Sequence, residues 1–70
     1  MEIPWVNGFC IRAEAQQGAA VIQANKAGLL SLAAQLTALA KEKPGCHIHY
    51  DRSNSLEDGS AELVIELLPD

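Results

Sequence analysis

Aromatic residues and cysteines are scarce in this sequence, and each shortage excludes something. One tryptophan, one tyrosine and one phenylalanine occur among 70 residues, so the core of the protein must be mainly aliphatic. The two cysteines, Cys10 and Cys46, are too far apart for a Cys-x-x-Cys redox motif, and no secretory signal precedes them. We therefore expect free thiols in a cytoplasmic protein.

Basic residues are also few and scattered. The five lysines and arginines form no stripe, and the nine acidic residues give a formal net charge of −4. Nucleic-acid binding needs clustered positive side chains that neutralise phosphates, so it is disfavoured. No apolar run approaches the roughly 20 residues of a membrane-spanning helix. The acidic balance favours a soluble protein or one whose partner is basic.

The length indicates one small domain. No repeat, linker or low-complexity segment divides residues 1–70, and residues 1–8 read as an irregular lead-in. A chain of this size buries only about 60% of its unfolded surface, so its stability margin is thin. Trp5 in the lead-in is expected to cover an edge of the core; an exposed Trp5 would instead anchor a partner.

Hydrophobic periodicity predicts four strands around one helix. Apolar and polar side chains alternate from Phe9 to Ala15, and the turn 16–18 leads into a second strand from Ala19 to Ala24. Two further strands are predicted over residues 46–50 and 60–68. With the helix between the two pairs, the order is ββαββ.

The helix has a clear start and a clear end. Asn25 is a good N-cap, and Pro44-Gly45 stops the helix. Between them, six apolar residues follow helical spacing as one stripe, with Ser31 and Gln35 off it. We expect this stripe to face the core, with Leu36 at its middle. The stripe comprises Leu29, Leu32, Ala33, Leu36, Leu39 and Ala40.

These elements predict an α+β fold in which the helix packs on one face of a four-stranded, mainly antiparallel sheet. One helix covers only one sheet face, so the other face is left for water or a partner. In the register that we expect for the last two strands, Tyr50 lies opposite Ala61 and His49 lies opposite Glu62. The uncovered face should carry Arg12, Glu14, His47, His49, Glu62, Val64 and Glu66.

The segment from residue 45 to residue 66 is the most informative part of the chain. His47 and His49 share one face of a strand, because strand side chains alternate. The polar loop 51–60 that follows is longer than the roughly 2–5 residues of a typical hairpin loop. A long polar loop beside paired histidines indicates a functional surface.

From Asn25 onward the chain resembles immunity protein family 32, whose members are predicted antidotes in bacterial polymorphic toxin systems. The resemblance lies in the helix start Asn25-Lys-Ala-Gly-Leu-Leu-Ser-Leu-Ala, in Gly45-x-His47-x-His49-x-Asp51, in Asn54-Ser-Leu-Glu-Asp-Gly-Ser60 and in Glu62-Leu-Val-Ile-Glu66. It implies a small, cytoplasmic, non-catalytic protein. It supplies no catalytic residues and does not name the toxin.

We therefore expect a protein that binds and occludes a basic toxin domain, with no cofactor and no bound metal. The uncovered sheet face and the 51–60 loop would form the contact surface, with acidic side chains that steer association. A homodimer is compatible with the sequence. The residues expected to bind are His47, His49, Asp51, Asn54, Glu57, Asp58, Glu62 and Glu66.

Two other hypotheses use the same segment. His47, His49 and Asp51 form a permitted ligand set for a divalent metal in a small structural homo-oligomer, but no second cluster closes the site. An enzyme would need Ser53 or Ser55 as nucleophile with His49 and Asp51. Serine-rich loops are usually turn formers, and no phosphate loop or nucleophile elbow is present.

Overall fold

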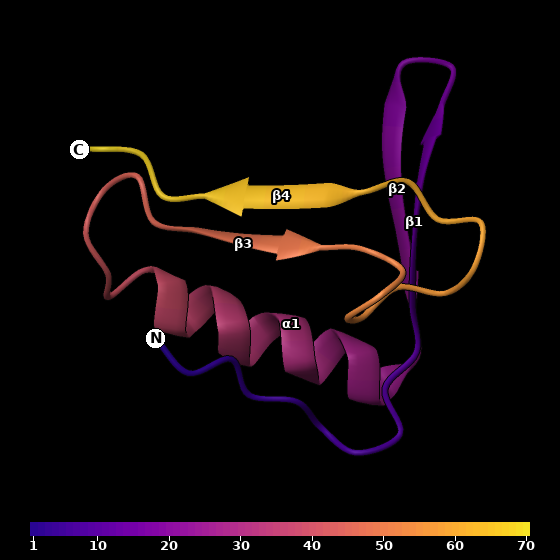
Figure 1. The fold of residues 1–70 in the computed structure, drawn as a ribbon, viewed down its shortest axis with the longest axis horizontal. Coiled ribbons are helices and arrows are strands. Elements are labelled where there is room, and N and C mark those ends of the chain that lie inside the picture. The colour runs from indigo at the N-terminus through magenta and orange to yellow at the C-terminus, as the bar shows by residue number, and fades with distance from the viewer.

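The computed structural model describes residues 1–70 and has the predicted ββαββ order of an α+β fold (Figure 1). Strands β1 (Ile11–Gln16) and β2 (Ala19–Ala24) form an antiparallel hairpin, and helix α1 (Lys26–Leu39) follows. Strands β3 (His47–Tyr50) and β4 (Leu63–Glu66) form a second antiparallel pair. The prediction for β2 is confirmed residue for residue. The helix, β3 and β4 are shorter than predicted.

The prediction of one four-stranded sheet is wrong, because the strands form two separate two-stranded sheets. The loop between β3 and β4 occupies the free edge of β1, where a further strand would pair. Glu57 N donates to Ile11 O at 2.9 Å, and Ala61 N donates to Ala13 O at 2.7 Å. Only one residue pair there, Ile11 with Leu56, reaches bridge geometry. A loop therefore completes β1 and keeps the two pairs apart.

The two sheets point in different directions (Figure 1). The β1–β2 hairpin projects from one end of the molecule, whereas β3 and β4 lie along α1. Residues 1–8 run along another side of α1. The buried apolar residues come from both strand pairs, the helix and the loop. They are Ile11, Ala13, Leu32, Leu39, Ile48, Tyr50 and Leu56.

The helix presents a different face to the core from the one predicted. Leu32 and Leu39 are buried, as expected, but Leu29 and Leu36 are 56% and 43% exposed. Ser31 and Gln35, placed off the stripe by the sequence, are fully buried instead. The helix is apolar around most of its circumference, so spacing alone did not single out the buried side.

Polar partners decide which side of α1 is buried. Gln35 lies between two other segments: Tyr50 Oη donates to its Oε1 at 2.6 Å, and its Nε2 donates to Pro4 O at 2.7 Å. Val6 N donates to Ser31 Oγ at 2.8 Å. Because every buried polar side-chain atom has a partner, burial of these residues carries no unpaired group. Burial also raises the pKa of the Tyr50 phenol, which stays neutral as a donor.

Trp5 covers part of the core edge. Its ring stacks on Phe9 with a centroid separation of 4.2 Å and meets the Tyr50 ring edge-on at 6.4 Å. It remains 37% exposed. The three aromatic residues thus form one cluster that fixes the lead-in against the rest of the protein.

The start of α1 is fixed by its cap and by a glycine. Asn25 Oδ1 accepts from Gly28 N at 2.8 Å and from Cys10 N at 3.0 Å, which confirms the predicted N-cap. A Cβ added at Gly28 would lie 2.6 Å from Cys10 O and 3.0 Å from an Ile11 side-chain carbon. The helix can therefore approach β1 this closely only with glycine at position 28.

The rotated helix face gives a matched pair of leucine substitutions. Leu39→Ala should lower the free energy of unfolding by about 2–5 kcal/mol, because Leu39 is in the core. Leu36→Ala should cost about 1 kcal/mol or less, because Leu36 is 43% exposed. Urea denaturation of both variants measures the difference. Equal losses would mean that Leu36 also faces the core.

Gly28→Ala provides a second test of helix packing. Helix propensity alone would make the variant more stable by about 1 kcal/mol. The contact with the Cys10 carbonyl should reverse the sign, for a net loss of about 1–3 kcal/mol. Ala33→Gly, at an exposed position of α1, measures the effect of helix propensity on stability without a packing contribution. A melting temperature that rises in Gly28→Ala would show that α1 does not approach β1 so closely.

Candidate functional site

The alternation predicted for β3 is confirmed. Ile48 and Tyr50 are 3% and 1% exposed, while His47 and His49 are exposed on the opposite face. The core lies on one side of β3, so Ile48 and Tyr50 are buried there. Successive strand side chains point to opposite faces, so both imidazoles point to solvent. The two histidines are therefore part of a surface.

The register of β3 with β4 differs from the predicted one by two residues. His49 lies opposite Val64 rather than Glu62, and His47 lies opposite Glu66. A shift of two residues keeps every side chain on its predicted face, so both glutamates still share the surface with the histidines. Glu62 precedes the first residue of β4, and its Oε2 lies 3.7 Å from His49 Nε2.

The exposed face of β3 and β4 has an apolar centre and charged neighbours. Val64 is 55% exposed, and Glu62 and Glu66 are exposed two residues to either side of it on the same face. We call this surface the acidic face. It consists of His47, His49, Glu62, Val64 and Glu66.

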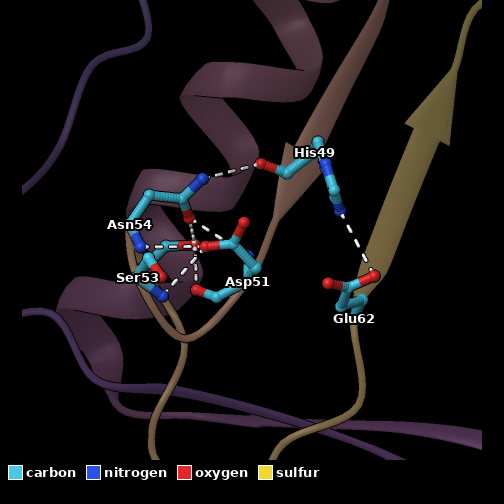
Figure 2. Close-up of polar contacts among 6 residues, drawn as sticks. His49, Asp51, Ser53, Asn54 and Glu62 are labelled. Carbon is cyan, nitrogen blue, oxygen red and sulfur yellow. Dashed lines mark hydrogen bonds and ion pairs between the residues drawn. The ribbon is translucent and has the colours of Figure 1, made fainter.

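Asp51 and Asn54 shape the loop next to the acidic face (Figure 2). Asp51 Oδ1 accepts from Ser53 N at 2.9 Å and from Asn54 N at 3.0 Å. Asn54 in turn accepts from Asp51 N at 3.1 Å and donates through Nδ2 to His49 O at 3.0 Å. These bonds close a tight turn directly after β3. Both residues therefore serve the fold of the loop, whatever else they contact.

Glu57 and Asp58 are held beside β1, not beside the histidines. Cys10 Sγ donates to Glu57 Oε1 at 2.8 Å, and this bond raises the pKa of the Cys10 thiol. Arg12 Nη1 donates to Asp58 O at 2.9 Å, and Arg12 also pairs with Glu14 at 2.6 Å. The carboxylate of Asp58 remains exposed and forms no ion pair.

Arg12 is a residue whose role the sequence did not indicate. The alternation of β1 correctly predicted the strand face on which Arg12 lies. It did not indicate that the Arg12 side chain would bond to the backbone of a loop 46 residues away. The exposed leucines of α1 were missed as well, because the stripe was assigned to the core. A charge-free run from residue 27 to residue 40 was the available signal.

One group of side chains could hold a metal ion. Ligand atoms of His49, Asp51 and Glu62 all lie within 4.8 Å of one another. His47, which the sequence placed in a metal site with His49 and Asp51, is not part of this group; Glu62 takes its place. The imidazole of His49 and the side chain of Glu62 are 47% and 72% exposed, so binding would first have to order them.

The hydrogen bonds do not assemble a nucleophile. The carboxylate of Asp51 bonds to backbone amides of the loop, and Ser55 Oγ contacts Asn54 Oδ1 and Asp51 O. No serine hydroxyl bonds to an imidazole.

The surface has two hollows, of about 710 and 380 Å³, and neither is lined by a histidine. The single helix lacks the length and apolarity of a membrane crossing.

A family model described as Immunity protein 32 matches residues 20–68. The chain belongs to this family. The match begins in β2 and includes the whole segment from His47 to Glu66, so the resemblance noted in the sequence is confirmed. Comparison with curated proteins and with solved structures gave no match in either case. Membership of an immunity-protein family implies a cognate toxin as the partner.

Zinc titration tests the expectation that no metal is bound. In calorimetry on chelator-treated protein, we expect no 1:1 binding tighter than about 1 μM, because three ligands, two of them exposed, leave the coordination shell incomplete. The matched variants are His49→Ala, inside the group, and His47→Ala, outside it. A micromolar site that disappears in His49→Ala and persists in His47→Ala would establish a metal centre.

Proposed function

We propose that this immunity protein neutralises its toxin by occlusion, with the acidic face and the 51–60 loop as the contact surface. The observation that carries the proposal is a set of carboxylates that the chain itself does not neutralise. On this surface Glu62 has only the half-exposed imidazole of His49 nearby, at 3.7 Å, and Asp58 and Glu66 have no basic side chain within ion-pair distance. Such groups are suited to a basic surface on another protein.

The composition of the acidic face supports the same function. Protein interfaces combine an apolar centre with a polar rim, and Val64 lies between Glu62 and Glu66 in this way. Tyr50 and Ile48 anchor the underside of β3 in the core, so the histidines are presented on a supported strand. A partner would meet this surface with little rearrangement of the strands.

The negative charge should act mainly on the rate of association. The chain has a net charge of −4, so a basic toxin would be attracted before contact, and salt would weaken the attraction.

Blocking access to the toxin needs no catalytic group. We therefore assign no residue of the chain a catalytic role.

Charge reversal on the surface tests the proposal. Glu62→Lys and Asp58→Lys should each slow association with the cognate toxin domain, by about tenfold at low salt, with a smaller effect at high salt. The matched control is Glu42→Lys, an exposed residue after α1 with the same change of charge. Stability of all three should change within about 0.5 kcal/mol. Binding kinetics at two salt concentrations give the comparison.

Two outcomes would contradict the proposed surface. In one, Glu42→Lys slows association as much as Glu62→Lys, so that only net charge matters. In the other, both surface variants bind normally, while Leu30→Lys abolishes binding. Leu30 lies on the outer side of α1 and is 60% exposed. The second result would transfer the contact to the exposed leucines of the helix.

A further inference from the structure

The two edges of the β1–β2 hairpin differ in a way that the toxin-binding function does not explain. On the β1 edge, the outward-pointing groups of Ile11 and Ala13 are bonded to the 57–61 segment. Ile11 O accepts from Glu57 N at 2.9 Å, Ala13 O accepts from Ala61 N at 2.7 Å, and Ala13 N donates to Ser60 Oγ at 3.2 Å. These bonds cover the β1 edge at Ile11 and Ala13; Ala15, next to the turn, has no such bond.

The β2 edge has no such cover. Antiparallel partners alternate between pairs that bond to each other and pairs that point outward. Because Ile11 and Ala13 point outward, their partners Ala24 and Ile22 also point outward, as does Ala20. No hydrogen bond from another part of the chain reaches these three residues of β2.

The free edge also lacks the devices that usually block pairing with another strand. Exposed edges are commonly protected by charged side chains, proline or a bulge. β2 reads Ala-Ala-Val-Ile-Gln-Ala, without charge or proline, and its register with β1 is continuous. Ile22 is 43% exposed on the same hairpin face as the buried Ala13. An uncharged, unbroken edge with an exposed isoleucine is suited to strand pairing.

We propose that two copies of this chain pair antiparallel through β2, joining their hairpins into one four-stranded sheet, β1–β2–β2–β1. A two-fold axis between identical antiparallel strands requires self-complementary edges. With Ile22 opposite Ile22 of the second copy, Ala20 lies opposite Ala24. All three outward-pointing residues then find partners, and each pair exchanges two hydrogen bonds.

Neither charge nor size within β2 opposes a second copy as the occupant. Copies with a net charge of −4 repel each other, but none of the five basic and nine acidic residues lies in β2. Contact there brings no like charges face to face. The central isoleucine pair has only alanines on either side along the edge, so no bulky side chain of β2 flanks it on that face.

Pairing would also complete an unfinished element. A two-stranded hairpin is marginally stable by itself, and this one projects from the end of the molecule (Figure 1). Its outer part exposes Ala15, Ala20 and Ile22 on the face that is buried nearer the core. In the dimer, the Ile22 side chains of the two copies lie side by side and shield each other from water.

The test measures mass and amide exchange on the unmodified 70-residue protein. Sedimentation equilibrium should give a mass that rises with concentration toward twice the 7.5 kDa of one chain. In hydrogen exchange, the amide of Ile22 should become protected as concentration rises, while Val21, already bonded to β1, stays protected throughout. A mass of one chain at every concentration, or an Ile22 amide that never gains protection, would overturn the proposal.

Lysine substitutions locate the contact. Ile22→Lys should raise the dissociation constant of the dimer about tenfold or more, because it places two charges at the two-fold axis. Val64→Lys makes a comparable change at an exposed valine on the other sheet and should leave the dimer intact. Circular dichroism checks that both variants are folded. If Leu30→Lys dissociates the dimer and Ile22→Lys does not, the copies meet through α1 and the proposal fails.

Discussion

The architecture depends on a buried chain of hydrogen bonds from Tyr50 through Gln35 to Pro4. It joins β3, α1 and the lead-in, three segments that are separate in the sequence. An amide at the centre of a small core is costly unless both of its ends are paired, so the three segments must be in place together. This requirement sets the rotation of α1 and turns a different set of leucines toward solvent.

A second constraint is the competition for the edge of β1. The 57–61 segment bonds to Ile11 and Ala13 and thereby takes the place of a third strand. The same contacts place Glu57 and Asp58 beside Cys10 and Arg12. The polar loop thus has a structural role, and the negative charge that it carries is fixed in position by β1. Fold and surface charge are determined by the same few bonds.

The protein exposes three distinct surfaces for its size. The acidic face lies on β3 and β4, the exposed leucines lie on the outer side of α1, and the uncharged edge belongs to β2. A core of seven apolar residues is small, so much of the apolar surface of the chain is left for other molecules. The surfaces are separate, so the toxin contact and the pairing of two copies that we propose would not compete for the same residues.

The sequence by itself determined the features that depend on neighbours in the chain. These are the element order, the Asn25 cap, the bounds of β2, the alternation along β3 and the family. It placed the histidines and glutamates on one face, because a strand repeats every two residues. The register of β3 with β4, which side of α1 is buried and how many sheets form depended on the tertiary structure. Each rests on a partner far away in the sequence, such as Pro4 for Gln35 or Ala61 for Ala13, and local pattern contains no information about that partner.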